Sequence, residues 1–225
     1  SQIKVALKGQ YRAATAQAPD LDVNLWVHDG SIRHNKAPAP FEHCWVNAAI
    51  RIPGLNPDQF SLSLDTLAFD LNGSHTRASI YVKGIDQPYI KTDVRSQLDL
   101  ALLDSALGLS AVDLRGRLDL QLQADGTYRS RLNPDKSSTV SSVPVYRLDA
   151  GIQNGYFKLD SLELPVQDVQ AHIRSACTTG HWQDASLAVD SLRAVLGKGR
   201  VAFNWSVKRL EQRAVPTHCS SDLQL

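Results

Sequence analysis

Apolar and polar residues alternate along most of the chain, which is typical of β-strands with two different faces. In residues 23–27, valine or leucine occupies every odd position, with an asparagine and a tryptophan between them. Similar alternation occurs in residues 3–7, 46–52, 62–71, 78–82 and 112–123. The pattern therefore predicts a protein made mainly of β-strands.

The pattern occurs twice, at a constant spacing. DGSIRHN (29–35) returns as NGYFKLD (154–160), FSLSLDTL (60–67) as ASLAVDSL (185–192), and ASIYVK (78–83) as FNWSVK (203–208). The glycines give 155 − 30 = 125 and the lysines give 208 − 83 = 125. We interpret this as a duplicated β unit. The predicted divisions are a first unit over residues 1–95, a connecting helix in 96–111, a second unit over 112–210 and a C-terminal tail in 211–225.

Several local features are predicted within this framework. Asp29-Gly30 is a typical hairpin turn, because glycine takes positive φ without steric cost. The apolar positions change parity between Leu64 and Leu67, and the same slip recurs at Asp190-Ser191. Such a slip indicates a β-bulge or bend built into each unit.

The segment between the units has a different pattern. Residues 96–108 predict the one good helix, with Ser96 and Asp99 as a capping box and Gly108 as a C-terminal cap. Residues 131–143 are polar and rich in serine, which predicts a mobile loop. The tail from residue 211 has little periodicity and is expected to fray.

Two architectures suit serial amphipathic strands. A closed sandwich or barrel would cover the apolar face, whereas an open sheet would stack its units end to end. Repetition favours the second. The predicted fold class is mainly β: an elongated, curved antiparallel sheet, or β-groove, of two repeated units with one short helix between them. About twelve strands spaced by about 4.8 Å would form a groove on the order of 55 Å long.

Composition and motifs narrow the function. The 24 Lys and Arg residues nearly balance 23 Asp and Glu residues, with no basic stretch suited to nucleic acid. The pairs His43-Cys44, Cys177 with His181, and His218-Cys219 offer too few converging ligands for zinc. No catalytic or phosphate-binding motif is found. We therefore expect no enzyme, catalytic residue, metal or cofactor. There is no run of eighteen apolar residues, and the chain opens within a strand pattern, which favours a piece of a longer protein.

Certain motifs resemble those of AsmA-like proteins. They are LDL (98–100) followed by DLRG (113–116), the LDTL and VDSL bends, and the two glycine turns, Gly30 and Gly155, each followed ten residues later by a proline (Pro40, Pro165). The resemblance covers about residues 1–210. It extends to the AsmA/TamB superfamily and the bridge-like lipid transfer proteins.

The resemblance implies a curved β-groove with an apolar inner face. It implies a periplasmic protein that is tethered to the inner membrane and moves phospholipid to the outer membrane, or otherwise supports outer-membrane homeostasis. The expected partners are phospholipid acyl chains and, through the full-length protein, both membranes. The alternative is a structural or adhesive β-repeat module that binds protein or glycan and holds no lipid.

The parity of the strands selects the residues expected to line the groove. The same alternation would also describe the core of a sandwich, so only the shared face is fixed by the pattern. The expected lining residues are Val23, Leu25, Val27, Ile32, Ala48, Ile50, Leu62, Leu64, Ile80 and Val82 in the first unit, and Leu148, Ala150, Ile152, Phe157, Ile173, Leu187, Val189, Trp205 and Val207 in the second.

Overall fold

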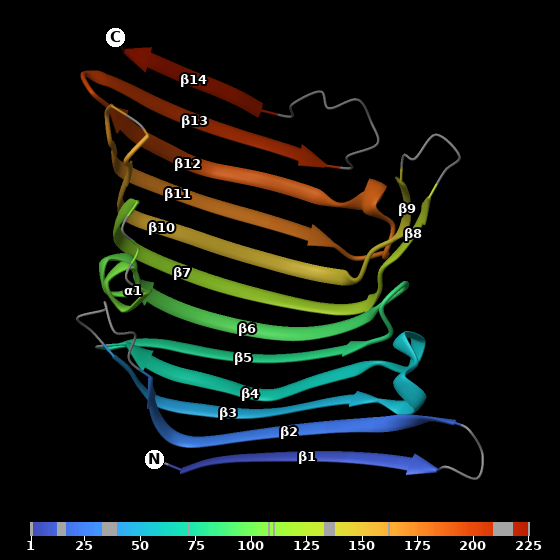
Figure 1. The fold of residues 1–225 in the computed structure, drawn as a ribbon. Coiled ribbons are helices and arrows are strands. Elements are labelled where there is room, and N and C mark those ends of the chain that lie inside the picture. The colour runs from blue at the N-terminus through green and yellow to red at the C-terminus, as the bar shows by residue number, and fades with distance from the viewer. Residues whose placement is uncertain are drawn as a thin grey trace.

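A single antiparallel sheet of twelve strands dominates the protein, as seen in a computed structural model (Figure 1). The structure describes residues 2–12, 17–32, 40–71, 73–107, 109, 111–132, 138–161, 163–208 and 218–224. In spatial order the strands are β1 (Gln2–Arg12), β2 (Gln17–Ile32), β3 (Phe41–Ile52), β4 (Ser61–Leu71), β5 (Ser74–Lys83), β6 (Tyr89–Asp99), β7 (Val112–Thr127), β10 (Val145–Leu159), β11 (Val166–Cys177), β12 (Ser186–Leu196), β13 (Gly199–Lys208) and β14 (His218–Gln224).

The sheet is open, with β1 at one edge and β14 at the other. Each strand pairs with its spatial neighbour in antiparallel register, so the order follows the chain except for an inserted hairpin. That hairpin, β8 (Arg129–Leu132) with β9 (Ser138–Ser142), forms a separate two-stranded sheet between β7 and β10. The predicted mainly-β, open, elongated sheet is therefore confirmed, and a closed sandwich or barrel is not formed.

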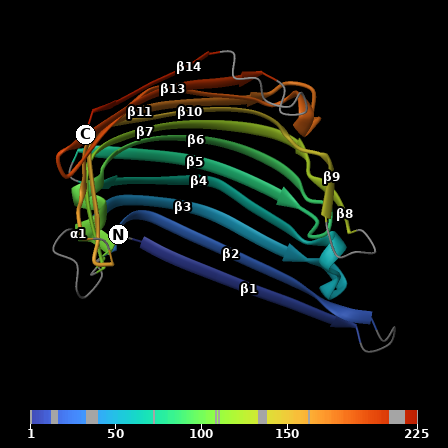
Figure 2. The same ribbon diagram turned by 90° about the horizontal axis from the view of Figure 1, so that it is seen from above.

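The spacing of 125 residues reappears in the element bounds. It relates β3 to β11, β4 to β12, β5 to β13, and the 3-10 turn η3 (Pro57–Gln59) to η4 (Trp182–Asp184). A further turn, η2 (Pro53–Leu55), precedes η3. The sheet bends into an arch (Figure 2). On its concave side, the turns and the hairpin β8–β9 lie at one end of the strands, and the helix α1 (Leu100–Leu107) lies at the other.

The predicted hairpin at Asp29-Gly30 is wrong. Strand β2 runs through this site, and its pairing with β3 shifts register between Val27 and Gly30. Asp29 has φ 49°, and His43 opposite has φ 48°. Because both strands bulge together, the chain stays paired where a lone Asp-Gly would turn back. The second unit repeats this geometry at Asn154 and Asp168, both with φ 51°. The bulge predicted after Leu64 is confirmed, as is its repeat between Val189 and Leu192.

The region around the helix also differs from the prediction. Residues 96–99 belong to β6, because their backbone pairs with β7 as far as Asp99 opposite Arg117. The Ser96 hydroxyl also bonds to that of Thr76 on β5 at 2.7 Å. The helix therefore begins at Leu100. The Asp99 carboxylate caps it by accepting a hydrogen bond from the backbone N–H of Ala101 at 2.9 Å. Gly108 lies outside the described residues.

Two segments expected to be irregular contain strands. The predicted loop 131–143 holds parts of β8 and β9, with residues 133–137 outside the described part of the chain. The predicted fraying tail holds β14, which pairs with β13 from Arg200 to Ser206. In both cases a partner strand supplies the backbone hydrogen bonds, and the local pattern of apolar residues does not indicate this pairing.

Candidate binding face

One face of the sheet is mainly apolar across the strands whose side chains the structure describes. The register aligns Val23, Ile50 and Leu62 across β2, β3 and β4, and Val82 follows on β5. In the second unit, Leu187 and Val207 are aligned across β12 and β13. Since side chains alternate between faces, each such row leaves its neighbours on the opposite side. This apolar face is the concave side of the arch. Cys177 shares the face, and its Sγ contacts the carbonyl oxygen of His181 next to the turn η4, which lies on the concave side (Figure 2).

The register places the expected lining residues on this one face. In the sheet they pair with one another or with apolar or small residues of neighbouring strands. The side chain of Ile32 lies outside the described part, although its backbone pairs with Phe41. Val207 is 2% exposed, and the other described members are half-buried. Among the described residues, no second sheet covers the face, and most of its apolar side chains stay partly exposed.

The most deeply buried strand residues belong to the same face. Leu71 and Cys177 are 0% exposed, and Cys44 and Val169 occupy equivalent sites beside the paired bulges of the two units. At Gly155 a Cβ atom would lie 2.9 Å from the Cβ of Val169, so glycine permits the close approach at this bulge. Cys177 is covered in part by the turn η4, because its Sγ contacts the carbonyl oxygen of His181.

The few polar side chains on the concave face satisfy one another or the backbone. Thr92 donates to the carbonyl of Ser79 at 3.0 Å, and Ser175 donates to that of Ser186 at 2.9 Å. Tyr146 Oη lies 3.0 Å from Ser175 Oγ. Among the described residues that the register assigns to this face, none is Asp, Glu, Lys or Arg. The face is thus uncharged across its strands.

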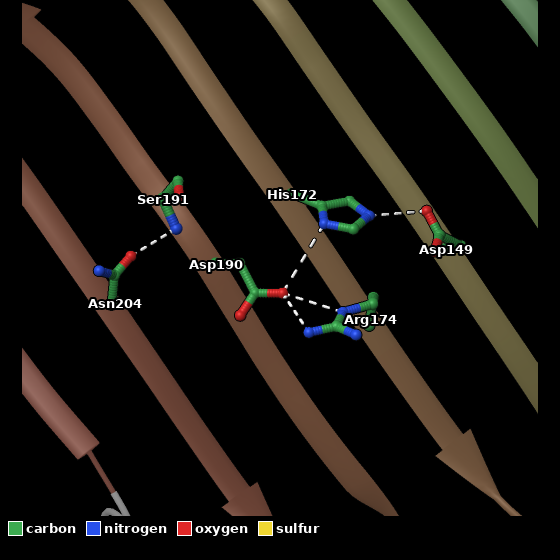
Figure 3. A network of polar contacts seen from close by, with 6 residues as sticks. All are labelled: Asp149, His172, Arg174, Asp190, Ser191 and Asn204. Atoms are coloured by element: carbon green, nitrogen blue, oxygen red, sulfur yellow. Dashed lines mark hydrogen bonds and ion pairs between the residues drawn. The ribbon is translucent and has the colours of Figure 1, made fainter.

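The convex face carries the charges. A network of polar contacts on β10, β11 and β12 joins four ionisable side chains, those of Asp149, His172, Arg174 and Asp190 (Figure 3). His172 Nε2 lies 2.8 Å from Asp149 Oδ1 and its Nδ1 lies 3.7 Å from Asp190 Oδ2. Arg174 Nη2 lies 2.7 Å from the same Asp190 oxygen. All four side chains are at least a third exposed, so each pair contributes well under about 1 kcal/mol.

This network belongs to the second unit alone. The positions 125 residues earlier hold Asn24, Asn47, Ala49 and Asp65. Both ring nitrogens of His172 face carboxylates. The arrangement links three strands on the side opposite Leu148.

The bulges of the first unit create a second polar pair on the convex face. His43 Nδ1 lies 2.9 Å from Asp29 Oδ1. This hydrogen bond is the main cause that raises the pKa of His43 above its ordinary 6.5 and lowers the pKa of Asp29 below its ordinary 3.8. Because the pKa of His43 is raised in the folded state, its interaction with Asp29 contributes fully to stability below pH 6.5, and this contribution is lost as the pH rises through the raised pKa. Because the pKa of Asp29 is lowered, its contribution is present above pH 3.8 and is lost as the pH falls through the lowered pKa. The pair therefore stabilises the fold fully between about pH 3.8 and 6.5.

Replacing Asp29 by asparagine is therefore expected to lower the pKa of His43 toward 6.5, because the carboxylate that favours the imidazolium is removed. The measurement is an NMR titration of the imidazole. Asp149→Asn, a convex-face change in the other unit, serves as the control and leaves the titration of His43 unchanged. An unaltered His43 pKa in Asp29→Asn would contradict the assignment.

The candidate metal-ligand pairs do not converge. His43 lies on the convex side with Asp29, whereas Cys44 is buried at 3% exposure under the concave side. Cys177 Sγ contacts the carbonyl oxygen of His181 at 3.3 Å and not its ring. The side chains of His218 and Cys219 are outside the described part. Within the described residues, no group of three or more His, Cys, Asp or Glu side chains is placed to hold a metal ion.

A hollow of about 950 Å³ opens over β5, β6, β7 and β10–β13. Its lining includes seven residues that the register assigns to the concave face: Thr92, Ala124, Tyr146, Leu148, Ser175, Leu187 and Val207. The lining also includes residues of the opposite parity, among them Lys91, Arg147, Arg174, Asp93, Asp125, Asp149 and Asp190. Sequence reasoning selected Leu148, Leu187 and Val207 here but missed Tyr146 and Ser175. The available signal was the repeat, since Ser175 stands where the first unit has Ile50.

Comparisons with known proteins add no assignment. A scan against protein-family models gave no match, and searches of curated proteins and of solved structures gave none either. The resemblance to AsmA-like proteins therefore stays a prediction from the sequence. Among the described residues, no helix has the length and apolarity needed to cross a bilayer.

Proposed function

We propose that the concave face binds the acyl chains of lipids and that the chain is a lipid-carrying segment of an AsmA-like protein. The observation that carries this proposal is the uncharged apolar face that runs across the sheet without a covering layer. A contiguous exposed apolar surface of this extent is rare on a monomeric soluble protein and marks an interaction site.

The chemistry of the face suits a hydrocarbon chain. Each methylene removed from water contributes about 0.8 kcal/mol, and the face places no ionised group against it. Rows such as Val23, Ile50 and Leu62 repeat from strand to strand, so a bound chain meets similar surroundings at each step. Movement along the face then changes the binding free energy little, and transport needs no catalytic residue.

The cellular setting follows from the resemblance alone. Under this proposal the segment is periplasmic and is tethered to the inner membrane through the full-length protein, and its cargo is phospholipid that passes toward the outer membrane. The support for this setting is the set of motifs around residues 98–116 and the paired bends of the two units.

The test is native mass spectrometry of the purified chain, followed by organic extraction. We expect co-purified phospholipid, because an uncovered apolar face acquires amphiphiles from the cell in which it is made. A lipid-free, monodisperse and normally stable protein that also takes up none from phospholipid vesicles would overturn the proposal. That result would favour a structural or adhesive repeat module instead.

A further inference from the structure

Two positions that line the hollow hold different residues in the two units of the sheet. The position of Ser175 corresponds to Ile50 in the first unit, and that of Tyr146 corresponds to Leu21. In β2 and β3, aliphatic side chains therefore fill the place where β10 and β11 present two hydroxyl groups. Ser175 lines the hollow of about 950 Å³ together with Thr92 of β6 and Ala124 of β7, which lie on the same face. This volume is within the range of ligand pockets, which combine apolar walls with a few polar groups.

We infer that this hollow holds the ester end of one glycerolipid, with the Tyr146 hydroxyl as the donor to an ester carbonyl. The inference rests on the proposed function and adds a fixed position and a polar contact to it. The first unit, which lacks both hydroxyls, offers acyl chains a surface without such a stop.

The hydrogen bonds show why Tyr146 is the donor that is free to change partner. Ser175 uses its proton on the carbonyl of Ser186 at 2.9 Å, so the contact of 3.0 Å with Tyr146 places the phenolic proton between Tyr146 Oη and Ser175 Oγ. If Tyr146 turns its proton to a ligand, Ser175 keeps its bond to Ser186. No buried donor is orphaned by the exchange, so its cost is small.

The charges of the site favour an ester over a carboxylate. The hollow's concave-face residues are Thr92, Ala124, Tyr146, Leu148, Ser175, Leu187 and Val207, none of which is charged. The cationic residues of its lining, Lys91, Arg147 and Arg174, have the opposite parity, so the register directs their side chains to the convex face. A carboxylate placed among them would lose its hydration without gaining a counter-charge. A neutral ester carbonyl accepts one hydrogen bond and needs no more, while the attached chain lies against Leu148 and Leu187. A charged headgroup then stays in water outside the hollow.

The experiment compares two lipids that differ in the carbonyl alone. The 225-residue chain is equilibrated with mixed vesicles of diester phosphatidylcholine and its diether analogue of equal chain length, and bound lipid is counted by native mass spectrometry. We expect the chain to prefer the diester about three- to tenfold, the effect of one net hydrogen bond. Tyr146→Phe should bring the ratio near one, whereas Tyr81→Phe, on the convex face, should leave it unchanged.

A second measurement locates the lipid without relying on a variant. A diester phosphatidylcholine with a photoreactive diazirine in its acyl chain should label peptides of β10–β13 more than those of β2–β5. Equal binding of the two lipids, or equal labelling of the two units, would overturn this inference and leave the proposed function standing. Failure to bind either lipid would reject both.

Discussion

Placing aspartate at both Ile50 and Leu64 is expected to abolish lipid binding to the first unit and to reduce total bound lipid severely. These residues lie on the concave faces of β3 and β4, where Ile50 pairs with Leu62 and Leu64 pairs with Ala48. An acyl chain seated there would desolvate two carboxylates that have no cation on the same face, which costs several kcal/mol per ion. Without lipid, both positions are only partly buried, so the fold tolerates the aspartates better than a fully buried core would.

The measurement is the amount of co-purified phospholipid per chain, with the free energy of unfolding determined in parallel. The matched control is Asn24→Asp with Asn47→Asp, which adds the same charge to the convex faces of β2 and β3. We expect the control to carry as much lipid as the unaltered chain. Equal lipid in the concave-face variant would show that lipid does not bind to the concave face of the first unit.

Replacing Gly116 by alanine is expected to be the most damaging conservative change in the sheet, at about 2–4 kcal/mol. Gly116 has φ +112°, which a residue with a side chain rarely adopts. An added Cβ would lie 2.8 Å from the carbonyl oxygens of Asn154 and Gln153 and from the Cα of Gly155. All three are backbone atoms, so relief requires β7 and β10 to separate beside the bulge.

Alanine variants of two other glycines distinguish backbone strain from steric overlap as causes of the lost stability. Gly54 has φ +57° with no atom within 4 Å of an added Cβ, so its alanine variant reports backbone strain alone, about 1 kcal/mol. At Gly151 the nearest atom is 4.0 Å away, so alanine should change stability by less than about 0.5 kcal/mol. Urea unfolding followed by tryptophan fluorescence measures all three. If Gly116→Ala costs no more than Gly54→Ala, the close approach of β7 and β10 is not rigid.

Much of the candidate face could be predicted from the sequence, because the direction of a strand side chain follows a local rule of period two. Val23, Leu25 and Val27 share a face whatever pairs beside them. The spacing of 125 residues then assigned the same face to Leu148 and Ala150. The bulge after Leu64 could also be predicted, since a bulge changes the parity of the apolar positions along the strand.

Other features depended on residues far away in the chain. Asp29-Gly30 forms a bulge instead of a turn because His43 bulges opposite it, and no local signal at Gly30 reports what the partner strand does. The same holds for residues 131–143 and for the tail, where backbone pairing with another segment decides between strand and loop.

The sequence by itself determined a mainly β, duplicated protein and the residues that share its apolar face, because alternation and repetition are properties of the chain read in order. The tertiary structure decided that the described part of the face stays open, that it is concave, and that a hollow forms over β5–β7 and β10–β13. The hollow depends on Ala124 and Tyr146 being paired neighbours across β7 and β10, beside Ser175 on β11. Which short side chains meet across strands is fixed by register, and register is set by the whole sheet.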